Sequence, residues 1–292
     1  MNGILLIDKP QGWTSHDVVG KLRGLLRERR IGHSGTLDPM ATGLLVVFIG
    51  RATRAVEFAE ADAKQYIAGL RLGVETDTQD ITGTVLRETC STVTQADLEA
   101  VLPRFTGALS QLPPMYSAIK VNGQKLYDIA RRGGEVERKP RQITIHSLKL
   151  ADNSHLEQGD FCLDVTCSKG TYIRTLCHDI GEALGVGGTM SSLRRVRAGR
   201  FHLDDALTLD EIAAAAAEGR AEHLLLPLDS LFFDRESLVL TEKQTKRTLV
   251  GGQFSVAAPG GTYRFYAPDG AFLALGKVEQ GTASTIKSFF EV

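Results

Sequence analysis

The stretch Gly32-His33-Ser34-Gly35-Thr36-Leu37-Asp38-Pro39-Met40-Ala41-Thr42-Gly43 contains three glycines, one proline and a single acidic residue, with little that could fill a core. Glycine permits backbone conformations closed to other residues, while Pro39 fixes its own φ and disfavours helix at Asp38. The apolar run at residues 44–49 follows and predicts a buried strand. We therefore predict a rigid, irregular loop over residues 32–43 that presents one carboxylate at the mouth of a core strand.

The carboxylate of Asp38 admits two interpretations. A carboxylate on a stiff loop beside a core strand is what an acid nucleophile or a general base requires. The alternative is an ordinary turn in which Asp38 forms a hydrogen bond with its own backbone. The length of the loop and its single acidic residue favour the first interpretation.

The composition is that of a soluble globular protein, with 292 residues, 42% of them hydrophobic and 24% charged. The N-terminal apolar run is cut short by Asp8 and Lys9, and no run has the length of a membrane span, so we expect a cytoplasmic protein. The four cysteines show no paired spacing, and the sequence has no P-loop or dinucleotide fingerprint. We therefore expect neither a metal site nor a cofactor.

The charge distribution is more informative than the net charge of −1. Three segments carry a basic excess: +4 over residues 21–30, +5 over residues 112–150 and +4 over residues 169–200. Acidic residues gather elsewhere, at 75–80 and 204–211. A near-neutral protein with segregated basic segments can bind a polyanion, so phosphate contact is expected.

Strand and helix signals alternate along the chain. The segments 4–7, 44–49, 64–72, 142–150 and 161–167 read as strands, and Ser15 is the expected N-cap of a helix over residues 16–27. This pattern predicts an α+β domain over residues 1–232, with a largely antiparallel mixed sheet and flanking helices. A basic, glycine-terminated excursion from the sheet is expected at about residues 112–150. Residues 233–292 are predicted to form a separate, small β-rich domain.

Several long motifs, in order and at matching spacing, resemble those of the TruB-type pseudouridine synthases, the bacterial tRNA pseudouridine-55 synthases. The first is the Asp38 loop itself, at residues 32–39. The others are Asn2-Gly3-Ile4-Leu5-Leu6-Ile7-Asp8-Lys9-Pro10, Lys64-Gln65-Tyr66, Leu112-Pro113-Pro114-Met115-Tyr116-Ser117-Ala118, Ser168-Lys169-Gly170-Thr171-Tyr172-Ile173-Arg174 and Leu193-Arg194-Arg195. The resemblance covers most of residues 1 to 230. It also implies that residues 233–292 are a PUA-type RNA-binding module.

The resemblance implies an isomerase that converts the T-loop uridine at position 55 of tRNA to pseudouridine, with Asp38 as nucleophile. It places Tyr66 against the uracil, as a stacking surface and an aid to removal of the C5 proton, and it pairs Arg174 with Asp38. From the pattern alone Tyr66 reads as a core residue, and Arg174 as a phosphate contact or a surface arginine. A guanidinium beside a carboxylate would orient it and keep it ionised.

The resemblance also implies a set of substrate-binding residues around an extruded base. It places Leu193 and Tyr172 in the pocket and has His33 stack within the RNA loop. Without the resemblance, His33 reads as a loop histidine hydrogen-bonded to backbone. Lys9 and Lys169 are expected to be structural or to contact phosphate.

We therefore expect a monomer that binds the T arm of tRNA, without a membrane or an obligatory protein partner. Two other classes of function remain open. One is a non-catalytic tRNA-binding or RNA-folding protein, which would leave the stiff Asp38 loop without a purpose. The other is a guide-RNA-dependent relative with the same catalytic motifs; the basic excursion favours the stand-alone type.

Overall fold

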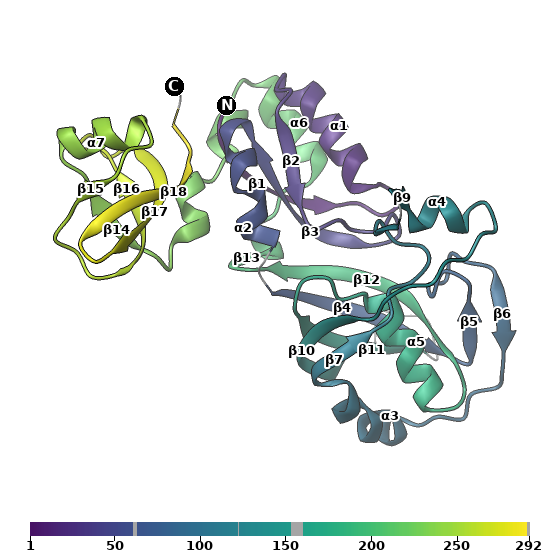
Figure 1. The fold of residues 1–292 in the computed structure, drawn as a ribbon. Helices are drawn as coiled ribbons and strands as arrows, with labels where there is room; N and C mark the ends of the chain where they lie inside the picture. The colour runs from purple at the N-terminus through teal and green to yellow at the C-terminus, as the bar shows by residue number, and fades with distance from the viewer. Residues whose placement is uncertain (61–62, 122, 153–159, 291–292) are drawn as a thin grey trace.

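The structure, a computed structural model, describes residues 1–60, 63–121, 123–152 and 160–290, and within them one nine-stranded sheet dominates (Figure 1). Its strands are β1 (Gly3–Lys9), β2 (Ile31–Ser34), β3 (Thr42–Ile49), β4 (Lys64–Leu72), β7 (Gly107–Gln111), β10 (Arg141–Ala151), β11 (Asp160–Cys167), β12 (Gly188–Ala198) and β13 (Phe201–His202). The helices that flank it are α1 (Ser15–Leu26), α2 (Val56–Glu60), α3 (Gln95–Val101), α5 (Ile173–Ala183) and α6 (Leu209–Ala217).

The sheet consists of two halves that meet at one short contact. The strand order is β1-β3-β12-β4-β11-β10-β7, with β2 added to β3 and β13 added to β12. Among the described strands of this sheet, β3 and β12 are the parallel neighbours, and the other pairs are antiparallel. The parallel contact joins Thr42 to Arg194 and Gly43 to Arg195. The predicted α+β class with a largely antiparallel mixed sheet is confirmed.

Both faces of β1 are buried, which explains its unbroken apolar sequence. Leu5 and Ile7 face α1 and α6, where they pack with residues such as Val18 and Ile212. Ile4 and Leu6 face the opposite side and join a second cluster. Successive strand residues point to opposite faces, so a strand covered on both sides must be apolar at nearly every position.

Two expectations for the segments around Asp38 need correction. Residues 31–34 form β2, which pairs with β3 from Ile31↔Ile49 to Ser34↔Val46, so the irregular part begins only at Gly35. The N-cap of α1 is Thr14, which forms a capping box with Asp17. Ser15 is instead buried, and its hydroxyl accepts a hydrogen bond from the backbone N–H of Leu37 at 2.9 Å.

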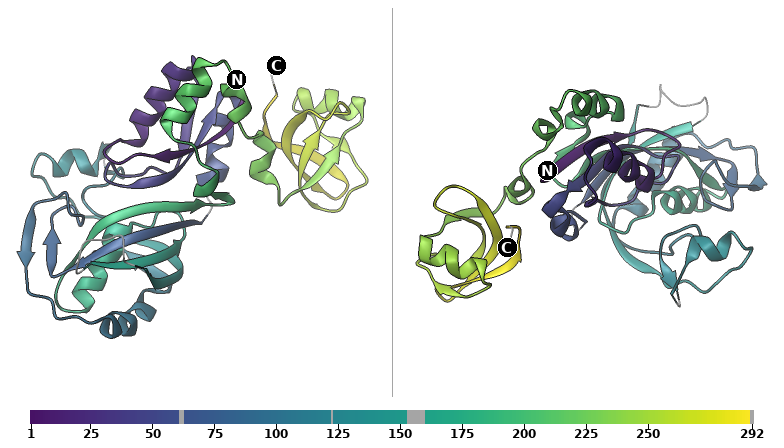
Figure 2. Two further views of the ribbon diagram at one scale, coloured as in Figure 1. Left: turned by 180° about the vertical axis from the view of Figure 1, so that it is seen from behind. Right: turned by 90° about the horizontal axis from the view of Figure 1, so that it is seen from above.

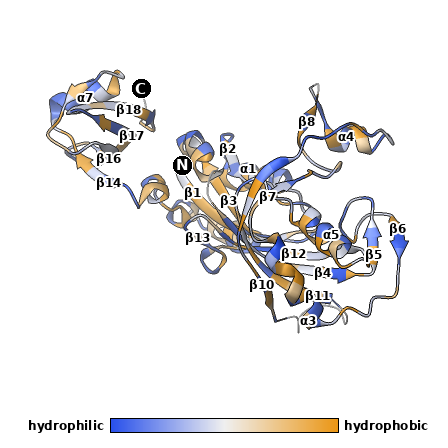
Figure 3. Ribbon diagram, turned by 60° about the horizontal axis from the view of Figure 1, so that its bottom comes forward, coloured by the Kyte–Doolittle hydropathy of each residue, from blue (hydrophilic) through white to orange (hydrophobic). Residues whose placement is uncertain are grey.

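Two small strand pairs project from the main sheet. β5 (Val74–Thr76) pairs with β6 (Val85–Glu88) beside α5. The basic excursion leaves the sheet after β7 and returns at β10, and it contains β8 (Lys120–Val121), β9 (Gln124–Lys125) and α4 (Leu126–Ala130). In Figure 3, α4 and β8 stand away from the sheet, and β5 and β6 form another projection.

The C-terminal part forms its own five-stranded sheet, in the order β14-β16-β17-β18-β15. Its elements are β14 (Glu236–Val239), α7 (Glu242–Leu249), β15 (Phe254–Ser255), β16 (Gly261–Tyr266), β17 (Phe272–Glu279) and β18 (Thr282–Ser288). It stands beside the β1–β3 half, on the side opposite the α4 excursion (Figures 1 and 2). Phe232, which precedes this unit in the chain, packs edge-on against Phe58 of α2 with 5.3 Å between ring centroids. Phe232 also contacts Phe272 and Phe289 of the C-terminal unit, so aromatic packing joins this unit to the main domain.

Candidate active site

The Asp38 loop lies where the two halves of the sheet meet, between the end of β2 and the start of β3. Gly35 leaves β2 with a positive φ of 68°. A turn follows, in which the Ala41 N–H donates to the Asp38 carbonyl at 3.0 Å. The buried side chain of Leu37 anchors the loop in the core, while the Asp38 side chain is 38% exposed. The loop therefore presents the carboxylate outward from a fixed backbone.

Lys9 stabilises the backbone of this loop from inside the protein. Its side chain is buried, and its ammonium donates to the carbonyls of Pro10, Trp13 and Pro39 at 3.0, 2.6 and 3.3 Å. Burial lowers its pKa to about 8, partly offset by the negative charge of Asp38. Of the two roles expected for Lys9, this geometry matches the structural one.

Arg174 forms an ion pair with Asp38, with 3.0 Å between Nε and Oδ2 and a longer contact of 3.5 Å between Nη2 and Oδ1. It lies in the first turn of α5 and is only 5% exposed. The guanidinium also donates to the carbonyls of Thr78 at 3.0 Å and Tyr116 at 2.8 Å. A buried guanidinium held at four points orients the carboxylate of Asp38.

Asp80 is a second carboxylate beside Arg174, although the charge pattern places it among acids that lie away from the basic segments. Its Oδ2 is 3.8 Å from Arg174 Nε, and the residue is buried. Its Oδ1 accepts hydrogen bonds from the Thr78 hydroxyl at 2.9 Å and from the Thr82 N–H and hydroxyl at 3.0 and 2.5 Å. The available signal was the spacing Thr78-x-Asp80-x-Thr82, since hydroxyls two residues from an aspartate often bind its carboxylate.

If this site carries out the RNA chemistry that the family resemblance implies, Asp80→Asn should slow turnover without weakening RNA binding. The substitution removes the buried charge opposite Asp38, so Arg174 loses one of the two carboxylates that fix its position. Rapid mixing with excess enzyme isolates the slowed chemical step, and filter binding reports affinity. A mutant that reacts at the wild-type rate would show that Asp80 only stabilises the turn at residues 76–82.

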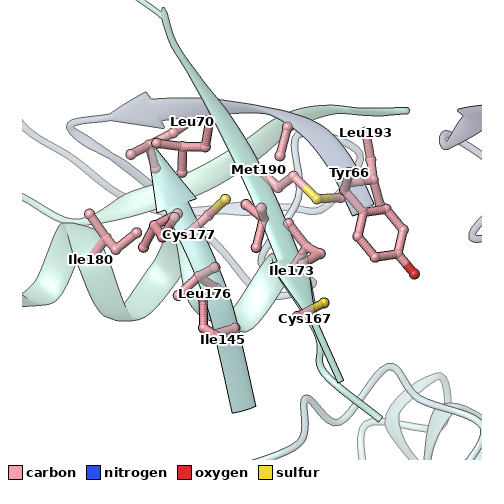
Figure 4. Packing of buried hydrophobic residues seen from close by; sticks show 14 of the residues in the cluster. Tyr66, Leu70, Ile145, Cys167, Ile173, Leu176, Cys177, Ile180, Met190 and Leu193 are labelled. Atoms are coloured by element: carbon pink, nitrogen blue, oxygen red, sulfur yellow. The ribbon is translucent and has the colours of Figure 1, made fainter. Parts of the chain in front are cut away.

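Tyr66 and Leu193 form an apolar wall next to the carboxylate. They come from the neighbouring strands β4 and β12, and each is 8% exposed. In Figure 4 they lie side by side at one end of the core cluster, and the Tyr66 hydroxyl points away from the other labelled side chains. Burial raises the pKa of Tyr66, and the charge of the nearby Arg195 guanidinium opposes this increase.

Tyr172 and His33 flank the same region. Tyr172 is the N-cap residue of α5. Its backbone N–H donates to Gln111 Oε1 at 2.8 Å, and its carbonyl accepts a hydrogen bond from Gln111 Nε2 at 3.0 Å. The His33 ring meets His16 edge-on at 5.6 Å, and among the described residues its buried Nδ1 has no hydrogen-bond partner. Burial lowers the pKa of His33 to about 4, so the ring is neutral near pH 7.

The structure brings some, but not all, of the expected site residues together. Asp38 and Arg174 are in contact, and Leu37, Tyr66, Ile173 and Leu193 share one apolar cluster around them. Lys169 lies exposed in the turn after β11. Within the described ranges, no three His, Cys, Asp or Glu side chains gather as a metal-binding group. A search of the same ranges finds no helix with the length and apolarity to cross a membrane.

Comparison with known proteins identifies the family. Residues 23–173 match the family model for the N-terminal domain of TruB family pseudouridylate synthases, and residues 174–233 match that for the tRNA pseudouridylate synthase B C-terminal domain. The tRNA pseudouridine synthase B of Bacillus cytotoxicus is 46% identical over 252 residues, which cover 85% of this chain and 82% of that protein. That of Geobacillus thermodenitrificans is 42% identical over 263 residues, covering 88% and 87%.

Solved structures share the fold. A chain of an H/ACA ribonucleoprotein bound to a substrate RNA containing 2′-deoxyuridine superposes with a TM-score of 0.74 at 23% identity, covering 99% of this chain and 85% of that one. A chain of a Cbf5–Nop10–Gar1 complex gives the same TM-score and coverage at 25% identity. The family models together cover most of the chain, and the relatives are more than 40% identical over most of their length: the chain belongs to the TruB family of pseudouridylate synthases.

Proposed function

We propose that this protein isomerises the T-loop uridine at position 55 of tRNA to pseudouridine. The observation that carries the proposal is the partly exposed Asp38 carboxylate, oriented by the buried Arg174 and bordered by the apolar wall of Tyr66 and Leu193. The relatives named tRNA pseudouridine synthase B support the reaction and the RNA class. Since the proposed substrate is tRNA, we place the enzyme in the cytoplasm.

The chemistry needs a nucleophile and a way to move one proton. Asp38 adds to base C6 or to sugar C1′, and the N-glycosidic bond breaks. The uracil then rotates and C5 bonds to C1′. The carboxylate is released, C5 loses its proton and N1 gains one, so atoms and charge balance. No electron is gained or lost and no energy carrier is consumed, so the proposed reaction requires no cofactor.

Tyr66 is suited to the late proton step and to holding the base. A flipped uracil needs an aromatic or apolar surface to replace the stacking it loses in the RNA. Tyr66, Leu193 and Tyr172 supply that surface in the proposal, and the neutral ring of His33 stacks in the vacancy left in the RNA loop. The Tyr66 hydroxyl assists removal of the C5 proton.

RNA binding is assigned to the basic excursion and to the C-terminal domain. In the excursion Arg131, Arg132, Lys139 and Arg141 are exposed. Burial raises the pKa of Tyr172, and Arg141 lies close enough for its charge to oppose this increase. We propose that residues 1–232 are the catalytic domain and that residues 233–292, with Lys243, Lys246 and Arg247 on α7, form a PUA-like RNA-binding domain.

Two alternatives differ in what the pure protein would do. A non-catalytic tRNA-binding protein would bind an unmodified tRNA transcript and leave it unchanged, and a guide-RNA-dependent enzyme would need a guide and partner proteins. The proposal predicts pseudouridine formation by the protein alone, acting as a monomer. Incubation with a transcript, digestion to nucleosides and mass spectrometry after chemical labelling of pseudouridine separate the three outcomes.

Neutralising four exposed cations of the excursion should weaken tRNA binding. We expect the variant with Arg131, Arg132, Lys139 and Arg141 changed to Gln to show a flatter dependence of log K on log salt. Each lost phosphate contact should reduce the slope by about 0.7–0.9. Arg138 is left intact, because it donates to the Pro113 carbonyl at 3.0 Å and supports the excursion. An unchanged slope would assign the RNA contact to another surface.

A further inference from the structure

Arg195 is an arginine whose side chain lies inside the protein beside the active-site loop. It is 1% exposed, whereas the neighbouring Arg194 points to the surface and forms an ion pair with Asp8 at 2.7 Å. Throughout the described part of the chain, no carboxylate oxygen comes within 4 Å of the Arg195 guanidinium. Removing a cation from water without a counterion costs on the order of several kcal/mol. The hydrogen bonds that the Arg195 guanidinium makes inside the protein must therefore offset this cost.

The guanidinium connects the two ends of the Asp38 loop. Its Nε donates to the carbonyl of Leu44 at 2.6 Å, and its Nη2 donates to the carbonyl of Gly35 at 3.0 Å. Gly35 is the residue at which the chain leaves β2, and Leu44 lies just inside β3. One rigid, planar group therefore sets the separation between the points where the Asp38 loop starts and ends.

The glycines at both ends of this loop fit around Arg195. Gly43 has a φ of 95°, and a Cβ there would lie 2.4 Å from the Arg195 carbonyl oxygen and 2.9 Å from its nitrogen. Gly35 has a φ of 68°, and a Cβ there would lie 3.2 Å from Arg195 Nη1. Both the backbone and the side chain of Arg195 thus occupy space that a larger residue would need.

Arg195 also faces Tyr66. The two residues are directly opposite each other in the β12–β4 register, so their side chains lie on the same face of the sheet. The Arg195 charge also opposes the increase in the Tyr66 pKa that burial causes. His33 and Lys9 lie near enough for the same charge to lower their pKa values. Arg195 is therefore a point of contact shared by the nucleophile's loop and the stacking tyrosine.

We propose that Arg195 is a positioning residue for catalysis, which fixes the position of the Asp38 loop relative to Tyr66 on the neighbouring strand. It contacts neither the RNA nor the reacting atoms and acts through Gly35, Leu44 and Tyr66. The inference rests on the proposed function and deepens it. Lysine can keep the charge but cannot donate to both carbonyls with one planar group that also lies beside Tyr66.

The test compares the full-length protein with its Arg195→Gln and Arg195→Lys variants. Arg71→Lys is the matched control, because Arg71 also lies in the main sheet and forms an ion pair with Asp160 at 2.8 Å, at the far end of β4 from Tyr66. For each protein, single-turnover pseudouridine formation with excess enzyme, equilibrium binding of the same tRNA transcript and thermal unfolding are measured. The double variant Arg195→Lys with Tyr66→Phe tests whether the two residues act together.

We expect Arg195→Gln to slow single turnover by about 10²-fold, as displacement of reacting groups by 1 Å can do, with binding within about threefold of wild type. Arg195→Lys should recover part of the rate, and its effect should be smaller in the Tyr66→Phe background than in the wild type. Arg71→Lys should lower the unfolding temperature without slowing the reaction. If Arg195→Gln does not fold, Arg195→Lys and the double variant carry the test.

Wild-type turnover in folded Arg195→Gln or Arg195→Lys would overturn the inference. So would a rate loss in Arg71→Lys equal to that in Arg195→Lys, because general destabilisation would then explain both. An inactive wild-type protein would instead reject the proposed function.

Discussion

Asp38→Asn is expected to abolish pseudouridine formation while tRNA binding stays within about tenfold, or about 1.4 kcal/mol. The amide has nearly the shape of the carboxylate but is a far weaker nucleophile. The loop should keep its conformation, because its backbone is held by Ser15, Lys9 and Arg195 rather than by the Asp38 side chain. Single-turnover product formation and equilibrium binding, measured on one transcript, report the two quantities.

Asp160→Asn provides a matched control for this substitution. Asp160 is also an aspartate in an ion pair with an arginine, Arg71, but it lies at the far end of β4 from Tyr66. Its amide variant should lose stability and keep activity. Asp38→Asn that reacts at a near-normal rate would remove Asp38 from the nucleophile role.

The second large effect is expected at Tyr66, where the core and catalytic interpretations give different results. Tyr66→Phe keeps the ring and its packing beside Leu193, so a purely structural role would leave activity almost intact. If the hydroxyl assists removal of the C5 proton, the variant should slow a late step by about 10²–10⁴-fold, the usual worth of general acid–base catalysis. Tyr66→Leu should lose a further 1–3 kcal/mol or so through the missing stacking surface.

Single-turnover kinetics of Tyr66→Phe, with its thermal unfolding curve as control, distinguish these readings. Binding of tRNA should be unchanged, because the ring that stacks on the base remains. A wild-type rate in a normally folded Tyr66→Phe protein would assign the tyrosine to the core alone.

The sequence was informative where chemistry is concentrated in a local motif. Glycine and proline spacing predicted a stiff turn around Asp38, and the apolar run after it predicted β3. The strand pattern predicted a mixed, mostly antiparallel sheet, and the structure confirms that class. The pairing of Asp38 with Arg174 came from the family resemblance, because the two residues are 136 positions apart and no local rule brings them together.

Residues that act through long-range contacts were harder to find. Asp80 reaches Arg174 only because the turn before β6 packs against the start of α5, with the Arg174 guanidinium donating to the Thr78 carbonyl at 3.0 Å. Arg195 looked like one cation in a basic segment. The alternation of β12 turns its side chain inward, while Arg194 points outward.

The same burial changes the interpretation of the basic segments. Over residues 169–200, the cations Arg174 and Arg195 lie inside the protein and Arg194 is paired with Asp8. That segment therefore offers much less free positive charge than its excess of +4 indicates. Residues 112–150 keep six exposed cations, which makes the excursion the stronger candidate for contact with phosphate.

The most direct test of the account uses the purified protein and two tRNA transcripts, one natural in sequence and one with cytidine in place of the T-loop uridine at position 55. Without guide RNA or another protein, the natural transcript is expected to gain one pseudouridine, mapped to position 55, and the cytidine transcript none. No product, or pseudouridine formed elsewhere in both transcripts, would contradict the proposed function.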